Sequence, residues 1–473
     1  MAVSNKTDIV VDYLVVGAGA SGLSFVDELL TRTSASILIV DKRDRPGGHW
    51  VDSYPYVRLH QPANQYGVQS KELSNGRLDE RGLNKGLSDL ASGVEIEAYF
   101  HTLMRDTFLP SGRVTFLPST EFLPDGTLRR GPSGQILTVQ IKKRLVDASY
   151  YTNIIPLNHT RPFAVENVTC TPPNNLPNVA KDFTNFTVLG AGKTAMDTCL
   201  WLLEQDVDPA RIRWIIPADY WFFNRANLQG SLEFFAESIE GFAGMFESIS
   251  EAKNASDFAL GCERAGIWMR LDPSIEPKQF HAATLASREV EELRRIQDIV
   301  RKGHVTKIEA HQITLTHGIV EAKPDTLYID CTASCLPDKP SVPVFQPGKI
   351  VLQMVRYPLI PFSCAKIAFL ESLEMQDEER NSFTTPMRFT KNLDGFIPAF
   401  GINLENTARE KQHPLLQNWL WQSRLDTFNR LEAAVKPEDG EKLAQLGRLQ
   451  TSFMAAYGNM PKLIASLESS ATY

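Results

Sequence analysis

The chain has 473 residues, of which 43% are hydrophobic and 22% are charged, and its formal net charge is −7. This composition is that of an ordinary soluble globular protein, and at roughly 100–200 residues per domain the length predicts two to four domains. It excludes a disordered polyampholyte, a collagen-like chain and a disulfide-stapled mini-protein. The acidic balance argues against a nucleic-acid partner, and no run of 18 apolar residues occurs, so we expect no membrane span.

A glycine-rich turn directly follows the first apolar run of the chain. Tyr13–Val16 is predicted as a buried strand, and the sequence Gly-Ala-Gly-Ala-Ser-Gly follows it at 17–22. Helical periodicity then extends over 23–30, and a second apolar run at 37–40 ends in Asp41. This order of strand, G-x-G-x-x-G, helix, strand and acid predicts a dinucleotide-binding fold.

Each residue type of this turn has a physical role in such a fold. Gly17 permits the tight turn after the strand, Gly19 lets a pyrophosphate approach the backbone, and Gly22 lets the helix pack closely on the strand. The N-terminus of the helix offers free N–H groups and a partial positive charge to the phosphates. We expect Asp41 to accept hydrogen bonds from an adenosine ribose.

A second glycine-rich turn recurs near the middle of the chain. The predicted strand Phe183–Leu189 leads into Gly-Ala-Gly-Lys-Thr-Ala at 190–195, which precedes a helical stretch through Leu203 and a strand at 211–216. Ala195 replaces the third glycine, as the fingerprint allows. The pattern predicts a second dinucleotide-binding fold.

The strand after the second turn departs from the pattern. Pro217 and Ala218 stand where an acid would mark NAD or an arginine would mark NADP. Arg213 and Arg225 lie nearby in the sequence, and either could meet a 2′-phosphate or be a solvated surface charge. Lys193 could likewise face a pyrophosphate or solvent. The second fold therefore either binds a nicotinamide cofactor or is vestigial and kept for packing.

The six cysteines are scattered along the chain, and their positions indicate both the cell compartment and which redox chemistry is excluded. None forms a C-x-x-C pair, and none lies in the first 169 residues, which excludes disulfide reductase chemistry. The first apolar run ends in glycines and not in a signal-peptide cleavage site, so we expect a cytoplasmic protein with reduced thiols. Neither zinc-ligand spacing nor a G-x-S-x-G elbow occurs, and we expect no metal site. The cysteines are Cys170, Cys199, Cys262, Cys331, Cys335 and Cys364.

The segment Gly47-Gly48-His49-Trp50 follows Asp41 closely. Together with the first turn, it resembles the FAD-binding start of the flavin-containing monooxygenase superfamily. Residues 190–197 resemble the second, NADPH-binding turn of that family, and 327–332 resemble its late crossing strand. The resemblance implies FAD at the first turn and NADPH or NADH at the second. It assigns FAD binding to Gly17, Gly19, Ala20, Ser21, Gly22, Asp41, Lys42, Gly48, His49 and Trp50, and nicotinamide binding to Gly190, Gly192, Lys193, Thr194 and Arg225.

The resemblance also indicates where catalytic residues lie. The segment 54–68 would run beneath the flavin ring, where family members often carry an asparagine that helps to hold the peroxyflavin. Gln61 is closest to that place by spacing, and Asn64 is three residues further on; a glutamine amide can donate to a flavin oxygen or a peroxide. His60 could transfer a proton near neutral pH or be a loop histidine bonded to the backbone. The candidate catalytic residues are therefore His60, Gln61 and Asn64, whereas the Baeyer–Villiger signature F-x-G-x-x-x-H-x-x-x-W is absent.

A long segment interrupts the second fold. Some seventy residues, 219–287, precede an expected helix at 288–301 and contain many aromatic side chains. A plain dinucleotide fold crosses back within about a dozen residues. The segment is expected to be either a helical subdomain with its own core or an aromatic-lined lid or substrate pocket.

The C-terminal third returns to strand-like and then helical patterns. Gly458 and Pro461 are expected to interrupt the last helix. Trp421 and Phe428 recur at helical intervals and are expected in the core, whereas Trp419 falls off that stripe. Helices are expected at 365–373, 415–435 and 441–457.

These elements predict an α/β fold with two Rossmann-like dinucleotide-binding domains, the second inserted in the first. The first domain is expected at 1–170 and again at 336–473, where C-terminal helices complete it. The second is expected at 171–335, with a helical insertion at about 226–287. Pro-rich linkers separate the parts.

The expected function follows from the resemblance. It implies an FAD-dependent oxidoreductase, an NAD(P)H-dependent monooxygenase that oxygenates a small organic molecule with O2 through a C4a-peroxyflavin. A flavin oxidase or dehydrogenase with a vestigial nicotinamide site is the alternative, supported by the weak 2′-phosphate site and the missing asparagine. A non-redox FAD-containing protein is a third class.

Overall fold

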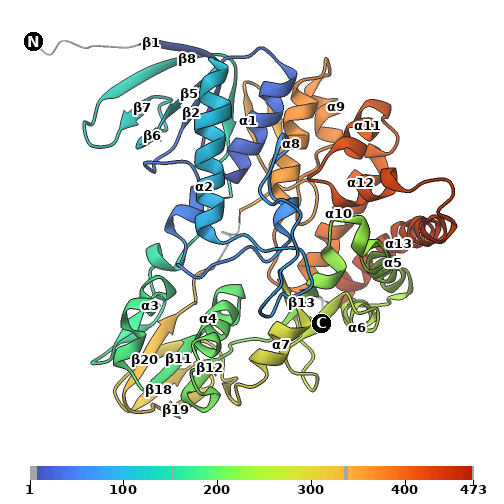
Figure 1. The fold of residues 1–473 in the computed structure, drawn as a ribbon. Coiled ribbons are helices and arrows are strands. Elements are labelled where there is room, and N and C mark those ends of the chain that lie inside the picture. Colours follow the sequence, from blue (N-terminus) through green and yellow to red (C-terminus); the bar gives the residue numbers. More distant parts are fainter. Residues whose placement is uncertain (1–7, 152, 335–338, 471–473) are drawn as a thin grey trace, which may run out of the picture.

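The first glycine turn lies at the carboxyl end of the central strand of a parallel sheet (Figure 1). The computed structural model describes residues 8–151, 153–334 and 339–470. The strands of this sheet are β1 (Asp8–Val16), β2 (Ile37–Val40), β5 (Val114–Leu117), β6 (Thr120–Phe122), β7 (Leu128–Arg130), β8 (Ile136–Asp147), β21 (Phe345–Gln346) and β22 (Lys349–Val351). The order is β21-β22-β8-β1-β2-β5, in which β22, β8, β1, β2 and β5 are parallel, while β7 pairs antiparallel with β8 and β6.

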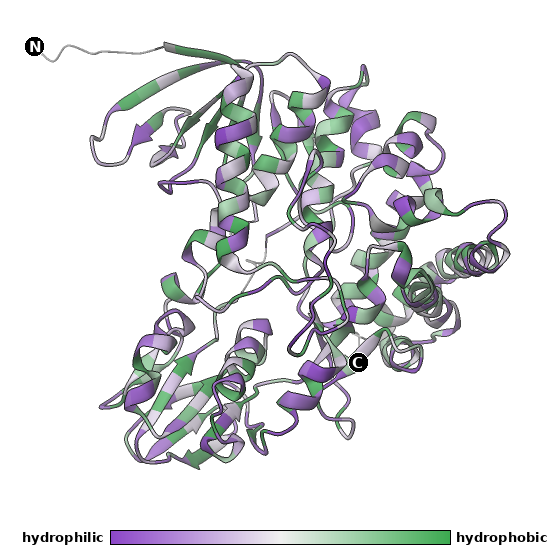
Figure 2. Ribbon diagram, in the orientation of Figure 1, coloured by the Kyte–Doolittle hydropathy of each residue, from purple (hydrophilic) through white to green (hydrophobic). Residues whose placement is uncertain are grey.

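Helices α1 (Ala20–Arg32), α2 (Gly93–Leu103) and α8 (Ile360–Glu371) pack beside this sheet (Figure 1). Helix α1 contacts α8, and Ser24 Oγ donates to the backbone oxygen of Pro361 at 2.7 Å. These two residues are 337 positions apart, so the C-terminal part of the chain completes the core of the first domain. Figure 2 shows hydrophobic residues on the strands of this sheet and on the helices beside it.

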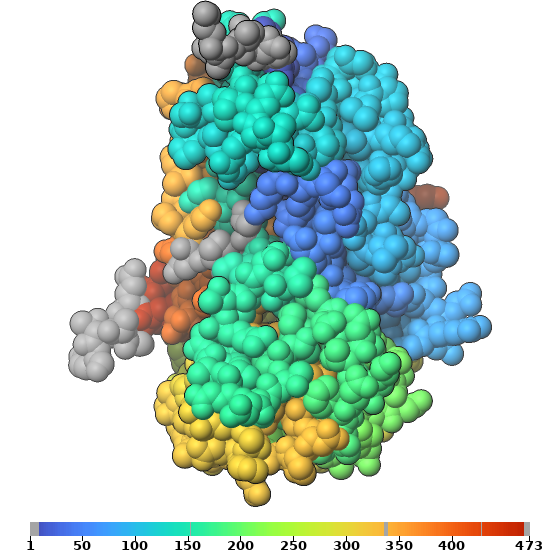
Figure 3. All heavy atoms as spheres, turned by 90° about the vertical axis from the view of Figure 1, so that its left-hand side faces the viewer, coloured from blue at the N-terminus to red at the C-terminus, as the bar shows by residue number. Residues whose placement is uncertain are grey.

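The second glycine turn follows the central strand of a second sheet, in which all neighbours are parallel. Its strands are β10 (Cys170–Thr171), β20 (Thr326–Asp330), β11 (Asn185–Leu189), β12 (Ile212–Ile215) and β16 (Asp298–Val300), in that order across the sheet. Helices α3 (Leu176–Val179), α4 (Lys193–Glu204) and α7 (Ser287–Leu293) belong to this part. Two parallel sheets, each with a glycine turn and a helix after its central strand, confirm the predicted α/β class. Figure 3 shows the second part stacked below the first.

The helix expected at 288–301 was wrong in its length. Helix α7 ends at Leu293, and residues 298–300 form the edge strand β16. This strand pairs with β12, and Arg213 on β12 forms an ion pair with Asp298 at 3.1 Å. Pairing with a neighbour distant in sequence outweighs the local helical pattern. Because Arg213 is held here, it is not directed at a 2′-phosphate.

The insertion is a mixed α/β unit and not a helical one. Its strands β14 (Trp268–Arg270), β13 (Tyr220–Asn224) and β15 (Gln279–Leu285) form a sheet in that order, and its helices are α5 (Phe235–Glu251) and α6 (Ala255–Arg264). Trp268 stacks on Phe280 with ring centroids 4.4 Å apart, and both side chains are buried. Aromatic residues favour strands, so part of the aromatic content of the segment lies in this sheet and its core.

Two small sheets complete the fold. One has the order β19-β18-β17-β9, and the other pairs β3 with β4. In the four-stranded sheet, β9 pairs with β17. Residues 164 and 165 therefore already belong with the second part, before the expected domain boundary at 171. The strands are β9 (Ala164–Val165), β17 (Val305–Ile308), β18 (Gln312–Leu315), β19 (Gly318–Glu321), β3 (Gly67–Val68) and β4 (Lys71–Glu72).

The C-terminal helices are α9 (Asp377–Ser382), α10 (Leu393–Glu410), α11 (Pro414–Gln422), α12 (Thr427–Ala434) and α13 (Gly440–Ser470). The single helix expected at 415–435 is two helices, because the Asp426 side chain caps α12 by accepting from the Asn429 N–H at 3.2 Å. The expected interruption at Gly458 and Pro461 does not occur. Met460 and its neighbours on α13 are buried against α5 and α10, and this packing outweighs the backbone hydrogen bond that proline removes.

Trp419, not Trp421, belongs to the core. Trp419 is 3% exposed, stacks on Phe369 at 5.0 Å and donates from Nε1 to Glu28 Oε1 at 2.7 Å. Trp421 is 45% exposed. The stripe that predicted otherwise assumed one continuous helix, whereas the chain changes direction between α11 and α12.

Four charged side chains form a buried cluster at the base of the C-terminal helices. Glu410 accepts from both Lys366 and Arg356, and Arg356 also pairs with Asp426 at 3.0 Å. Lys366 and Glu410 are fully buried, and burial lowers the pKa of Lys366. Glu410 therefore compensates both cations, and it is the one carboxylate paired with Lys366 among the described residues; an unpaired buried charge is costly.

Removing Glu410 is expected to leave two buried cations without their shared partner. Glu410→Ala should lower the free energy of unfolding by about 3–5 kcal/mol, measured as a fall in thermal midpoint and in denaturant resistance. The matched control is Glu405→Ala on the same helix, whose pair with Arg409 is exposed and should contribute less than about 1 kcal/mol. Equal effects of the two substitutions would contradict this account.

Candidate active site

The two glycine turns have nearly identical backbones. Gly17 has φ +114° and Gly190 has φ +116°, a region that favours glycine. Gly19 caps α1 with φ −89° and ψ −174°, and Gly192 caps α4 with φ −78° and ψ 179°. Neither helix has a side-chain cap or an acidic residue in its first turn. Both helix N-termini therefore present uncompensated N–H groups suited to an anion.

The first turn tolerates only glycine because three backbones meet there. A Cβ on Gly22 would lie 2.0 Å from the backbone oxygen of Gly17, and a Cβ on Gly48 would lie 2.8 Å from Gly19 Cα. Gly48 also has φ +61°. The segment after the second strand is thus pressed directly against the turn. The result is a backbone-lined cradle without side chains, as a pyrophosphate requires.

Asp41 stands at the end of β2 beside this cradle. Its Oδ2 accepts from the Ala18 N–H at 2.7 Å, and its Oδ1 accepts from the Arg43 N–H at 2.8 Å. These bonds orient the carboxylate next to the turn. The position is that of an acid which accepts from a ribose in such folds.

A cavity of about 1540 Å³ begins at the first turn. A pocket for one small ligand usually measures roughly 300–1,000 Å³, so this cavity has room for a dinucleotide and a second molecule. Gly22 packs α1 against β1 and is not part of the wall. The predicted residues that line the cavity are Gly17, Gly19, Ala20, Ser21, Asp41, Lys42, Gly48, His49 and Trp50. The residues present therefore fit a dinucleotide.

The residues of the second turn do not line this cavity. Lys193 forms an ion pair with Asp197 one helical turn further on, and Tyr54 of the first domain donates to Asp197 at 2.6 Å. A Cβ on Gly192 would meet nothing within 4 Å, so the approach to this turn is open. The predicted nicotinamide residues Gly190, Gly192, Lys193 and Thr194 are together at this turn, but none of them lines the cavity.

Arg225 does not face a ligand, and its predicted role at a 2′-phosphate was wrong. Its side chain is fully buried. It donates to the backbone oxygens of His60 and Thr284 at 2.9 and 3.1 Å and to Asn84 Oδ1 at 2.9 Å, and it pairs with Glu289 at 2.8 Å. These partners occupy all three nitrogens of the guanidinium. Arg225 therefore positions the His60 loop from behind, a role that no sequence pattern indicates.

His60 lines the cavity as a neutral imidazole. Its Nδ1 accepts from the Thr284 N–H at 3.3 Å, which leaves the ring proton on Nε2. Burial, together with the nearby cations Lys193 and Arg225, lowers the pKa of His60 to about 3. It is therefore a hydrogen-bond donor at neutral pH, and the expectation of proton transfer near pH 7 does not fit this environment.

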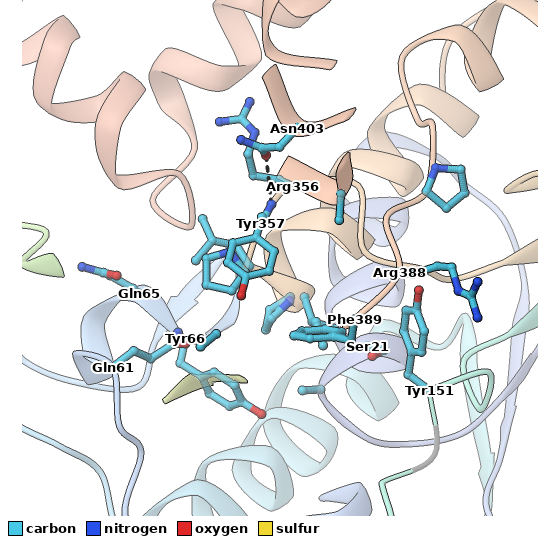
Figure 4. A pocket seen from close by; sticks show the side chains of 18 of the residues that line it. Ser21, Gln61, Gln65, Tyr66, Tyr151, Arg356, Tyr357, Arg388, Phe389 and Asn403 are labelled. Atoms are coloured by element: carbon cyan, nitrogen blue, oxygen red, sulfur yellow. Dashed lines mark hydrogen bonds between the residues drawn. The ribbon is translucent and has the colours of Figure 1, made fainter. Parts of the chain in front are cut away.

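The neighbours of His60 divide between cavity and interior. Gln61 lines the cavity, as does Gln65, which donates to the backbone oxygen of Leu228 at 2.7 Å (Figure 4). Asn64 does not line it: its Oδ1 is buried without a partner in the described part of the chain, and its backbone oxygen accepts from Arg424. The structure therefore does not support Asn64 as a catalytic candidate. In the 3-10 turn over Ala63–Gln65, the Gln65 side chain faces the cavity and the Asn64 side chain does not.

The wall opposite His60 and Gln61 comes from segments that sequence reasoning did not connect. Tyr151, Tyr357 and Phe389 form an aromatic group in which ring centroids lie 6.1 and 6.3 Å apart (Figure 4). The Tyr357 N–H donates to Asn403 Oδ1 at 3.0 Å. These residues share no motif and are up to 252 positions apart, so only the fold could bring them together.

The described ranges contain no helix that is long and apolar enough to span a bilayer. In the same ranges, no group of three or more His, Cys, Asp and Glu side chains is placed to hold a metal ion. Cys170, Cys199, Cys262, Cys331 and Cys364 are free thiols. Cys335 lies outside the described residues, and so does the expected domain boundary at 335.

Comparison with known proteins finds a matching family model and similar mycobacterial proteins. A family described as NAD(P)-binding Rossmann-like domain matches residues 15–69, which confirms the nucleotide-binding part of the predicted resemblance. The protein Rv2000 of Mycobacterium tuberculosis and the protein Mb2023 of Mycobacterium bovis, both described as uncharacterized, are each 39% identical to this chain over 463 residues. The match covers 98% of this chain and 85% of each relative.

Solved structures that match part of this chain include two monooxygenases. An open crystal structure of cyclohexanone monooxygenase is 14% identical with a TM-score of 0.49, and it covers 77% of this chain and 87% of its own. The flavin-containing monooxygenase from Stenotrophomonas maltophilia is 15% identical with a TM-score of 0.40, over 75% of this chain and 88% of its own.

Three histidines that line the cavity, His49, His60 and His281, are expected to make the fold sensitive to acid, and burial lowers the pKa of His281 to about 4. Burial lowers the pKa of His60 to about 3 and that of His49 to about 4, from an ordinary 6.5. Below pH 6.5 the unfolded chain binds protons that the folded chain excludes, so this contribution to stability is complete above pH 6.5 and is lost as pH falls. The thermal midpoint should therefore decrease as pH is lowered from neutrality toward about 5.

The double substitution His49→Gln, His60→Gln should reduce this slope, measured by thermal unfolding across the same pH range. His317→Gln is the control at an exposed position and should keep the original slope. An unchanged slope in the double variant would show that other groups cause the acid sensitivity.

Proposed function

The chain belongs to the family of the mycobacterial protein Rv2000, and we propose that it is an FAD-dependent oxidoreductase, an NAD(P)H-dependent monooxygenase that oxygenates a small organic molecule with O2. The continuity of the cavity supports this proposal most directly. One space runs from the uncapped N-terminus of α1 to the side chains of His60, Gln61 and Tyr357. A cofactor held at α1 by its phosphates can therefore extend toward groups that hydrogen-bond a reacting centre.

The residues of the first domain would hold FAD by several contacts. Gly19 and Gly48 leave the backbone accessible to the pyrophosphate, and the N–H groups of α1 supply the positive end of a helix dipole. Asp41 would accept from the ribose. When bound, FAD supplies the two-electron chemistry that accepts hydride from a reduced nicotinamide and activates O2.

The residues around the far end of the cavity would serve the reaction. His60, kept neutral and oriented by the Thr284 N–H, would donate a hydrogen bond from Nε2. The Gln61 amide offers a second donor. Tyr357 and Phe389 supply an apolar wall that excludes water, which strengthens these hydrogen bonds.

The second turn is proposed as the nicotinamide site. Its backbone repeats the first turn within 11° at the capping glycine and within 2° at the turn glycine, and Gly192 is open to an approaching phosphate. Lys193 and Thr194 begin the helix there. Arg213 and Arg225 are both engaged by the protein, so neither is available to a 2′-phosphate.

A flavin oxidase or dehydrogenase is the second candidate, and one observation favours it. The second turn does not line the cavity, and Asp197 of the second part accepts from Tyr54 of the first domain and pairs with Lys193 on its own helix. In that case the substrate itself would give hydride to FAD, and the second fold would serve packing alone.

One anaerobic titration separates these candidates. The purified protein is expected to show a flavin absorption spectrum, and addition of NADPH or NADH without oxygen should bleach it. A protein without flavin would refute both candidates. Bound flavin that neither nicotinamide bleaches would support the oxidase or dehydrogenase.

Two matched substitutions test the turns separately. Gly19→Val should abolish flavin retention, because a side chain would fill the cradle against Gly48. Gly192→Val has space for its Cβ and should retain flavin while slowing its reduction by the nicotinamide at least tenfold. The readouts are the flavin-to-protein absorbance ratio and anaerobic stopped-flow reduction. Full flavin content in Gly19→Val would show that the phosphates lie elsewhere.

A further inference from the structure

The cavity continues beyond the groups assigned above into a second region, here called the C-terminal arm. It extends among helices α5, α10, α12 and α13, away from the glycine turn. Its wall comes from the insertion and from the C-terminal third of the chain, and most of the lining side chains are apolar; Asn403, Thr407 and Asn429 also line it. The apolar lining side chains are Phe242, Phe246, Phe400, Phe428, Leu446, Leu449 and Phe453.

The aromatic rings of the C-terminal arm form a continuous wall. Phe400 lies 6.2 Å from Tyr357, measured between ring centroids, so the wall begins at the reaction end of the cavity. Phe246 lies 6.5 Å from Phe400 and 6.5 Å from Phe242, and Phe242 lies 4.3 Å from Phe428. A wall of five successive rings is longer than a compact substrate needs, and it matches an extended chain.

The C-terminal arm reaches the protein surface at a mouth of mixed charge. Lys411, Glu432 and Gln450 line the cavity and are exposed, so the arm opens between the end of α10, helix α12 and helix α13. A cation and an anion at the same mouth select neither sign of charge. Inside, Thr407 donates to the backbone oxygen of Asn403 at 2.8 Å, and the Asn403 Oδ1 accepts from Tyr357. Thr407 and Asn403 are thus bonded to the protein itself, as is Asn429, whose Nδ2 donates to Asp426 Oδ2 at 2.9 Å.

We infer that the C-terminal arm binds an uncharged substrate with an extended apolar chain, which enters at the α10–α12–α13 mouth and presents its other end at Tyr357. A wall made mostly of phenylalanine and leucine side chains favours burial of methylene groups, each of which contributes to binding. The inference rests on the proposed function only where it calls this molecule the substrate. The binding of a chain in the arm is independent of flavin.

Helix α13 contains one glycine at which a larger side chain would block the C-terminal arm, and a second glycine that serves as a control. Leu443, Leu446, Gly447, Gln450 and Phe453 line the cavity at helical spacing and form one face of α13. A Cβ on Gly447 would meet nothing within 4 Å, so Gly447→Leu adds bulk at the arm without a backbone clash. Gly458, on the same helix, has equally free space but does not line the cavity. Gly458→Leu is therefore the matched control.

The test measures displacement of the neutral fluorescent probe N-phenyl-1-naphthylamine by straight-chain primary alcohols from butanol to dodecanol. In the wild-type protein, affinity should rise about three- to fourfold per added methylene until the arm is filled. Gly447→Leu should weaken dodecanol binding at least tenfold and leave butanol within twofold. Gly458→Leu should match the wild type throughout.

Three outcomes would overturn the inference. Affinity that does not change with chain length would exclude an extended apolar site, and identical behaviour of the two leucine variants would place the chain outside the arm. Tighter binding of dodecanoate than of dodecanol would contradict an uncharged ligand. Flavin content is measured on the same samples, so a protein that lacks flavin but shows the chain-length series would refute the proposed function and leave the arm intact.

Discussion

The close approach of Gly19 to Gly48 is the constraint on which the rest of the site depends. It joins the first strand, the first helix and the segment after the second strand at one point, where a Cβ on Gly48 would lie 2.8 Å from Gly19 Cα. Because no side chain enters, the N–H groups of α1 remain available to an anion. The same contact directs His49 and Trp50 into the wall of the cavity, and it sets where the chain must run toward His60.

The remainder of the cavity is closed by parts of the chain that arrive much later. Tyr357 and the C-terminal helices form one wall, and the insertion contributes Phe242 and Phe246. Buried charges hold these parts in place: Arg225 ties the His60 loop to Glu289, and Glu410 ties Lys366 to Arg356. Such networks stabilise one arrangement because any other would leave a charge unpaired in the interior. The site is therefore held by buried charged groups where chemistry is proposed, and is mostly apolar where a substrate is proposed.

Sequence patterns that span about thirty residues or fewer predicted the local structure correctly. Both glycine turns, the strands that frame them and Asp41 lie where the fingerprint places them, since their geometry depends on residues within about thirty positions. Patterns that needed the surroundings were misleading. Arg225 looked like a phosphate ligand and is a buried support, Asn64 points away from the cavity, and Trp419 took the core position expected of Trp421. In each case burial or a distant partner, invisible along the chain, decided the outcome.

Local sequence was thus sufficient to define two dinucleotide-binding folds and the cradle of the first, because glycine and the end of a strand restrict the backbone by themselves. The cavity was decided by tertiary structure alone. Its walls combine Ser21, His60, Phe246, Tyr357 and Phe453, whose proximity follows from sheet order and helix packing and not from any motif. The protonation of His60 was decided in the same way, since its free imidazole would titrate near pH 6.5 and only burial beside Lys193 and Arg225 keeps it neutral.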